Sequence, residues 1–172
     1  MDSHLLSPAS QSARKRRAVR VGIVSLGCAK NLVDAEIMLG SLAEAGMEIT
    51  NDAALADAII VNTCSFIDAA QEESVDAILE QAAIRDAHRR GQALVVSGCL
   101  PQRHREELAA LLPEVDAFMG LDQVRQAPEV VREALARRRQ RRGRVSERDR
   151  AGGGKAATHE TEPVYRVTPR SR

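Results

Sequence analysis

Three cysteines are the only thiols in the sequence, and their surroundings share a pattern. Each lies just after an apolar run and just before a segment of helical character: SLGCAKN contains Cys28, NTCSF contains Cys64 and SGCLP contains Cys99. A cysteine that serves only as packing more naturally lies inside a helix or strand, on its buried face. Thiols at three strand ends instead favour metal or redox chemistry.

The elements that must position these cysteines alternate between strand and helix. Strands are expected at residues 18–26, 47–50, 58–63, 93–97 and 115–120. Helices are expected at 31–46, 69–90, 101–112 and 127–142, the first with a buried face of Leu32, Ala35, Leu39 and Leu42. This alternation predicts the α/β class: a doubly wound, mostly parallel five-stranded sheet with helices on both faces, a three-layer fold of flavodoxin or Rossmann type.

The predicted topology brings the three cysteines together. In a doubly wound sheet of order 2-1-3-4-5, the first, third and fourth strands are neighbours, and each of them precedes a cysteine. The three strand ends then span about 10 Å of one sheet edge. Loops that bend inward would place three thiolates around one small inorganic centre. Gly27 and Gly98, each directly before a cysteine, would let the backbone approach such a centre closely.

Several uses of these thiols stay open at this point. Thiolate ligation suits zinc or an iron–sulfur cluster. Zinc normally closes four positions, and His104, the nearest fourth candidate, falls inside an expected helix. Three thiolates on a cubane cluster would leave one iron without a protein ligand. The remaining alternatives are three buried free thiols that serve as packing, and redox disulfide exchange.

Composition limits the class of protein. The 172 residues are 44% hydrophobic and 28% charged, as in a soluble globular domain, and only 2% are aromatic. With a net charge of +1 and few aromatic side chains, the sequence predicts neither direct nucleic-acid binding nor membrane attachment. The arginine run at residues 137–150 is interpreted as a solvated helix end rather than a phosphate-binding segment.

The first 17 residues carry their basic cluster after their apolar residues, the reverse of the order in a secretory signal. We therefore expect a cytoplasmic protein with reduced thiols. An odd number of cysteines also fits a disulfide framework poorly.

Three segments together resemble a known family. SLGCAKNLVDAE, VNTCSFIDAAQEES and SGCLPQR are similar, in the same order, to the N-terminal domain of the methylthiotransferases, which are radical-SAM enzymes. The resemblance is closest to the RimO type, which modifies an aspartate of ribosomal protein S-twelve, and it covers roughly residues 19–138. The MiaB-type transfer-RNA enzymes are the alternative, although they typically carry a GCQMN-like first motif.

This resemblance implies that Cys28, Cys64 and Cys99 hold an auxiliary 4Fe-4S cluster with one open iron, which carries the sulfur or methylthio group to be transferred. It also implies that the complete enzyme cleaves S-adenosylmethionine at a second 4Fe-4S cluster on a CxxxCxxC motif. The implied partner is ribosomal protein S-twelve or the small ribosomal subunit, and the sulfur donor is unknown. No residue of this sequence is assigned a catalytic role.

The sequence departs from the family pattern, because it contains no CxxxCxxC and its three cysteines are already assigned. We expect a disordered leader at residues 1–17, the cluster-binding domain at 18–142, and a flexible linker at 143–172 toward a radical-SAM domain outside the sequence. Such a chain would bind a cluster but would not generate the radical alone.

Two alternatives from other classes remain. The first is a flavodoxin-like small-molecule-binding module without a cluster, although the turn LGCAKN lacks a phosphate-binding glycine pattern. The second is an accessory protein that binds RNA through the arginines near the two ends of the chain.

Overall fold

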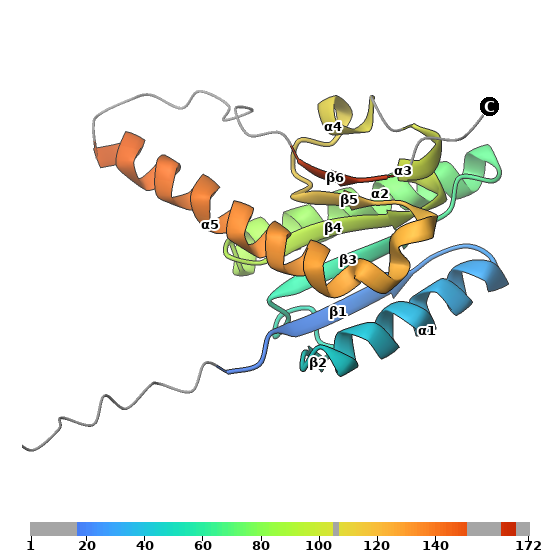
Figure 1. Cartoon of the computed structure of the whole chain (residues 1–172). Coiled ribbons are helices and arrows are strands. Elements are labelled where there is room, and N and C mark those ends of the chain that lie inside the picture. Colours follow the sequence, from blue (N-terminus) through green and yellow to red (C-terminus); the bar gives the residue numbers. More distant parts are fainter. Residues whose placement is uncertain (1–16, 105–106, 151–162, 168–172) are drawn as a thin grey trace, which may run out of the picture.

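The computed structural model describes residues 17–104, 107–150 and 163–167. These residues form a parallel sheet of strand order β2-β1-β3-β4-β5-β6 (Figure 1). The strands are β1 (Arg20–Ser25), β2 (Glu48–Ile49), β3 (Ala58–Thr63), β4 (Ala93–Gly98), β5 (Ala117–Met119) and β6 (Val164–Arg166). The α/β class and the adjacency of β1, β3 and β4 are confirmed, although the sheet has a sixth strand that was not predicted.

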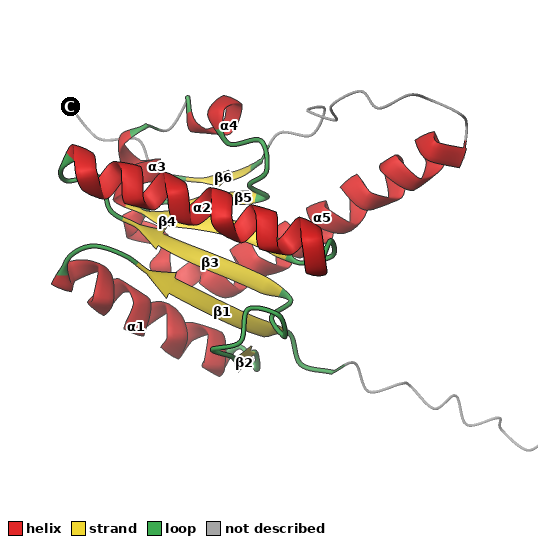
Figure 2. Cartoon of the chain, turned by 180° about the vertical axis from the view of Figure 1, so that it is seen from behind, coloured by secondary structure: helices red, strands yellow, loops and turns green. Residues whose placement is uncertain are grey.

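Helices cover both faces of the sheet, as predicted. They are α1 (Ala29–Glu44), α2 (Asp68–His88), α3 (Cys99–Arg103), α4 (Leu108–Leu111) and α5 (Ala127–Arg150), with the 3-10 turn η1 (Leu121–Gln126) before α5. α1 and α5 pack on one face, and α2 lies across the other face with α3 and α4 (Figure 2). Within the described part of the chain, no helix is both long and apolar enough to cross a membrane.

Aliphatic side chains fill the two layers between the sheet and the helices. Every residue of β3 and β4 is buried, which agrees with their apolar sequences AIIVNT and ALVVSG. Because successive side chains of a strand point to opposite faces, Ile60 packs in the layer of α1 and α5, and Ile59 packs in the layer of α2. Packing on both faces fixes the strands in register, so the strand ends reach defined positions.

The buried face of α1 differs from the predicted face. Ala35 and Leu42 are buried as expected, but Leu32 is 58% exposed, whereas Asn31 and Met38 are fully buried. The Asn31 side-chain amide donates hydrogen bonds to two backbone carbonyls of neighbouring loops, which turns this side of the helix inward. A polar anchor therefore overrides the aliphatic pattern in the first turn of α1.

The C-terminal part differs from the flexible linker predicted at residues 143–172. α5 continues to Arg150, and β6 pairs in parallel with β5. This pairing satisfies backbone groups along the edge of β5, and Val167, after β6, is buried. The helix predicted at 101–112 is present as the short helices α3 and α4. Residues 1–16, 151–162 and 168–172 lie outside the described residues, so the proposed domain boundaries stay predictions.

A buried carboxylate joins the sheet to α2 and α5 at the edge opposite the cysteines. Asp116 is fully buried directly before β5 and accepts a hydrogen bond from the Leu94 N–H at 2.9 Å. Guanidinium nitrogens of Arg85 on α2 and Arg141 on α5 lie 3.5 and 3.4 Å from its oxygens. Arg137 on α5 donates to the Asp116 backbone carbonyl at 3.0 Å. One residue thereby ties both helices to the sheet.

We expect Asp116→Ala to lower the free energy of unfolding by about 3–5 kcal/mol, because it leaves the buried Leu94 N–H without its acceptor and removes the buried carboxylate that Arg85 and Arg141 share. Glu48→Ala is the control, since Glu48 pairs with Arg20 on the surface at 3.1 Å and its loss should cost less than about 1 kcal/mol. Urea unfolding measures both variants. If the two variants lost the same free energy, the Asp116 network would not be what holds the helices to the sheet.

Candidate metal centre

The carboxyl ends of three adjacent strands bring the cysteines to one edge of the sheet. Cys28 follows β1 by three residues, and Cys64 and Cys99 directly follow β3 and β4. The register places the last residue of β3 opposite the last residue of β4, so these two strands end level with each other. The structure thus places all three thiols at the edge where the sequence predicts them.

Cys64 is the buried member of the three, with 4% of its surface exposed. Its backbone N–H donates to the Ser74 hydroxyl on α2 at 3.0 Å, and that hydroxyl lies 2.8 Å from the Cys64 carbonyl oxygen. Gly27 has a φ of +89°, and a Cβ there would lie 2.4 Å from the Cys64 Cβ. Only glycine therefore lets the loop after β1 pass directly over Cys64.

Cys99 is the first residue of α3 and is partly buried. The preceding Gly98 has a φ of +102°, and a Cβ there would lie 2.2 Å from the Thr63 carbonyl oxygen. Burial raises the pKa of the Cys99 thiol, and the negative charges of the Cys64 and Cys28 thiolates add to this effect. Cys99 therefore favours the protonated thiol as long as no cation is bound nearby.

Cys28 is exposed and occupies the N-cap position of α1. The backbone N–H groups of Asn31 and Lys30, at the start of α1, hold the pKa of the Cys28 thiol below its ordinary value. The positive end of the helix acts in the same direction. Cys28 is therefore accessible to solvent, and its thiolate form is favoured. Both properties are expected of a metal ligand rather than of a residue that serves as packing.

Two buried asparagines cross-link the loops at this edge. The Asn31 Nδ2 donates to the carbonyl oxygens of Leu26 at 2.7 Å and Thr63 at 2.9 Å, and the Asn62 Nδ2 donates to the Asn31 carbonyl at 2.8 Å. The Oδ1 atoms of both asparagines are buried and have no hydrogen-bond partner among the described residues. Buried acceptors of this kind normally receive a hydrogen bond. These two oxygens can therefore accept hydrogen bonds from water or from a bound group at this edge.

Two further residues that the sequence did not single out support the cysteine loops. Ser74 holds the backbone of Cys64, and Arg103 on α3 donates to the Ser65 carbonyl at 2.8 Å. Ser74 lies four residues before Ile78, so both share the buried face of α2. A hydroxyl on a buried face needs a hydrogen-bond partner, and the role of Ser74 could therefore have been predicted from the sequence. The contact of Arg103 depends on how α3 meets the loop after β3, and the sequence pattern carries no sign of it.

The residues at this edge match a three-thiolate centre in chemical type. Within residues 17–104, 107–150 and 163–167, no three His, Cys, Asp or Glu side chains lie close enough together to hold a single metal ion. The thiolates of a cubane cluster each bind a different iron, so they stand farther apart than the ligands of one ion. His104 follows α3, and its buried Nε2 has no hydrogen-bond partner among the described residues.

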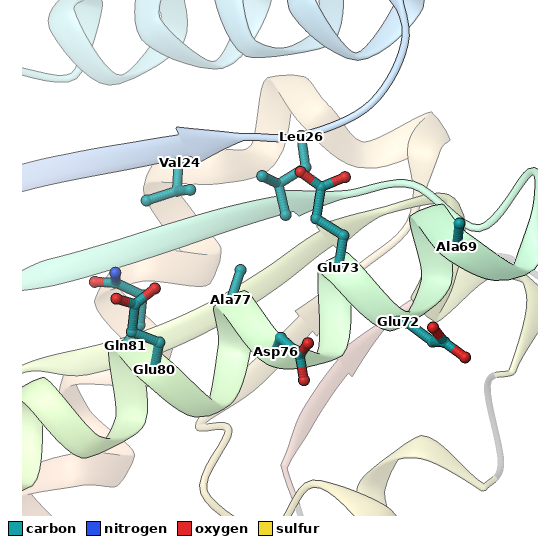
Figure 3. A pocket seen from close by; sticks show the side chains of 9 residues that line it. All are labelled: Val24, Leu26, Ala69, Glu72, Glu73, Asp76, Ala77, Glu80 and Gln81. Carbon is teal, nitrogen blue, oxygen red and sulfur yellow. The ribbon is translucent and has the colours of Figure 1, made fainter.

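A groove of about 700 Å³ lies beside the cysteine edge, between the end of β1 and α2 (Figure 3). Val24 of β1 and Leu26, directly after β1, point toward the helix (Figure 3). The remaining lining residues come from α2. Four of them are carboxylates, Glu72, Glu73, Asp76 and Glu80, and the others are Ala69, Ala77 and Gln81. Carboxylates repel phosphate groups, so this groove does not suit the nucleotide or flavin that a flavodoxin-like binding module would hold.

Comparison with known proteins places most of this domain in one family. A family profile described as "Uncharacterized protein family UPF0004" matches residues 20–120. The matched span contains Cys28, Cys64 and Cys99.

Similar curated proteins bear the name "Ribosomal protein uS12 methylthiotransferase RimO". The protein of Akkermansia muciniphila is 48% identical over 151 residues, which cover 87% of this chain and 32% of that protein. The protein of Symbiobacterium thermophilum is 55% identical over 72% of this chain and 25% of its own length. The protein of Trichlorobacter lovleyi is 58% identical over 66% of this chain and 25% of its own length.

The chain thus spans about a quarter to a third of the length of these relatives. The resemblance to the RimO-type methylthiotransferases, predicted from three short motifs, is confirmed by identities of 48–58%. The chain belongs to the family described as Uncharacterized protein family UPF0004.

Proposed function

We propose that this chain is the cluster-binding domain of a RimO-like methylthiotransferase, with Cys28, Cys64 and Cys99 as the protein ligands of a 4Fe-4S cluster. The observation that carries the proposal is the placement of every thiol of the chain within three residues of the ends of three adjacent parallel strands. The names of the similar proteins support the enzyme class.

The three cysteines differ in how firmly the fold holds them, and this difference assigns each a role. Cys64, buried and held by Ser74, and Cys99, at the start of α3, form the fixed part of the ligand set. Cys28 is the exposed member that completes it, with its thiolate favoured by the α1 N-terminus. A cluster with three protein ligands supplies one open iron, which suits delivery of a sulfur or methylthio group.

The alternative of three incidental packing thiols accounts poorly for Cys28. A packing residue is buried, whereas Cys28 is exposed and lies where backbone donors stabilise its anion. The zinc alternative needs a fourth protein ligand, and His104, the nearest candidate in the sequence, lies after α3 and not directly beyond a strand. A cluster with one open position makes use of all three thiols and needs no fourth side chain.

We further propose that the activity belongs to a longer enzyme of which this chain is one part. S-adenosylmethionine and a second cluster would be bound outside these 172 residues, because no CxxxCxxC occurs in them. The substrate would be an aspartate of ribosomal protein uS12, free or in the small ribosomal subunit, in accordance with the names of the relatives. We place the protein in the cytoplasm, where reducing conditions keep the thiols free for iron.

Anaerobic reconstitution with iron and sulfide should give a brown protein with about four irons per chain. Cys28→Ala should lose most of this iron and its visible absorbance. Because Cys28 is exposed, the variant should keep the far-ultraviolet circular dichroism and melting temperature of the parent. Ser25→Ala is the matched control and should bind iron normally, since the Ser25 side chain is exposed and its hydroxyl makes only a long hydrogen bond, 3.5 Å, to the Asn31 carbonyl.

Two results would contradict the cluster assignment. One is a parent protein that is folded but takes up no iron under these conditions. The other is a Cys28→Ala variant that holds as much iron and sulfide as the parent. Cys64→Ala should also lose the cluster, but its side chain is buried, so its folding must be checked first.

The metal-free protein should react with iodoacetamide in the order Cys28, Cys99, Cys64. Since the pKa of Cys28 is lowered, its alkylation should persist at a lower pH than that of a free cysteine. The raised pKa of Cys99 and its partial burial should make its reaction slower and dependent on higher pH. Peptide mass spectrometry after timed quenching measures the order, and Cys99 reacting before Cys28 at neutral pH would refute it.

The 172-residue chain with its reconstituted cluster should not cleave S-adenosylmethionine under reducing conditions. Its three cysteines are all needed for one cluster, so no thiolates remain for a second one. Chromatographic detection of 5′-deoxyadenosine above the level of a protein-free control, from pure material, would contradict this expectation.

A further inference from the structure

A basic surface lies at the end of the molecule opposite the cysteine edge. Its exposed members are Arg90, between α2 and β4, and Arg139 and Arg142 of α5. Arg138 of α5, whose side chain is only 11% exposed, lies among them. These four residues are here named the arginine patch. α5 runs past the sheet, and its last turns extend beyond the body of the fold (Figure 1). The net charge of the chain is only +1, yet residues 137–150 contain eight arginines and two acidic residues.

The fold brings together arginines that are far apart in the sequence. The Arg138 Nε donates to the Arg90 carbonyl at 2.9 Å, which joins α5 to the turn before β4. Arg142 lies over the same turn, since a Cβ on Gly91 would be 2.7 Å from an Arg142 guanidinium nitrogen. The patch therefore combines two segments about 50 residues apart along the chain, a surface that the arginine run alone does not reveal.

Negative charge at the patch is too small to balance it. Asp86 pairs with Arg138 at 3.2 Å and is shared with Arg85 at 3.0 Å. Arg139 and Arg142 are exposed and form no ion pair with the residues that the structure describes. Burial, and to a lesser extent the charge of Arg85, lower the pKa of the Arg138 guanidinium, while Asp116 and Asp86 act in the opposite direction.

Like charges four residues apart on a helix repel each other, and Arg138 and Arg142 form such a pair. The fold nevertheless holds them side by side above one turn. An external anion would relieve this repulsion. A row of guanidinium groups matches a row of phosphates in charge and in hydrogen-bonding geometry.

We propose that the arginine patch binds the phosphate backbone of RNA. Recognition would be independent of sequence, because aromatic side chains that could stack on bases make up only 2% of the chain. The choice of RNA rests on the proposed function, since the relatives are named for a ribosomal protein. The phosphate binding itself rests only on the patch. This proposal replaces the sequence-based expectation that the domain does not bind nucleic acid.

The test is fluorescence anisotropy of the metal-free 172-residue chain with a labelled RNA duplex of about 16 base pairs, between about 50 and 200 mM salt. The parent should bind with a micromolar Kd at low salt and weaken steeply as salt rises. Arg139→Ala with Arg142→Ala should weaken binding at least about tenfold at low salt and reduce the salt slope by about two. Both side chains are exposed, so the melting temperature should not change.

Matched variants separate the patch from net charge. Arg125→Ala with Arg132→Ala removes the same charge from exposed sites outside the patch and should change the Kd less than about twofold. Arg139→Lys with Arg142→Lys should bind more tightly than the alanine pair and keep the salt slope of the parent, since the attraction to the phosphate backbone depends mainly on charge. If the two alanine double variants lost RNA affinity to the same extent, the proposal that the arginine patch binds RNA would be overturned. Absence of RNA binding by the parent at low salt would also overturn it.

A DNA duplex of equal length and an acidic polypeptide complete the experiment. A lower Kd for either than for the RNA duplex would overturn the assignment to RNA. None of these measurements requires iron. Failure of RNA binding and failure of cluster binding can therefore be told apart.

Discussion

The cysteine edge depends on the close approach of β3 and β4 at their carboxyl ends. Gly98 lies so near the backbone of Thr63 that any side chain at position 98 would collide with the Thr63 carbonyl oxygen. That same carbonyl accepts a hydrogen bond from Asn31 at the start of α1. The ends of β1, β3 and β4 are thus joined through one peptide group. Cys64 and Cys99, each directly after one of these strand ends, take their positions from this contact.

The same geometry sets how the three thiols differ in charge. Three thiolates close together in a partly buried site repel one another, and either protonation or bound cations relieve that repulsion. Burial and the neighbouring thiolates raise the pKa of Cys99, whereas Cys28, the thiolate-favoured member, is exposed to water. A bound cation would favour the thiolate form of all three.

The sequence predicts the sheet order and the edge well, because apolar runs mark the buried strands and short turns leave few ways to connect them. It fails where polar side chains set the geometry. Asn31 turns the first helix so that Leu32 faces solvent, and no periodicity of aliphatic residues shows this. β6 is missed because Val164–Arg166 is only three residues long, so its pairing with β5 depends on an available edge. The split of the helix predicted at 101–112 likewise has no marker in the apolar pattern.

The distribution of charge also depends on the course of α2 and α5. α2 carries Glu72, Glu73 and Asp76 near the cysteine edge, while its C-terminal end meets the arginine patch of α5. A molecule of nearly zero net charge therefore has an acidic end and a basic end. In the field of RNA phosphates, such a protein turns its basic end toward the RNA and its acidic end away. If the substrate is a protein bound to RNA, this orientation leaves the cysteine edge and its acidic groove directed at polypeptide rather than at phosphate.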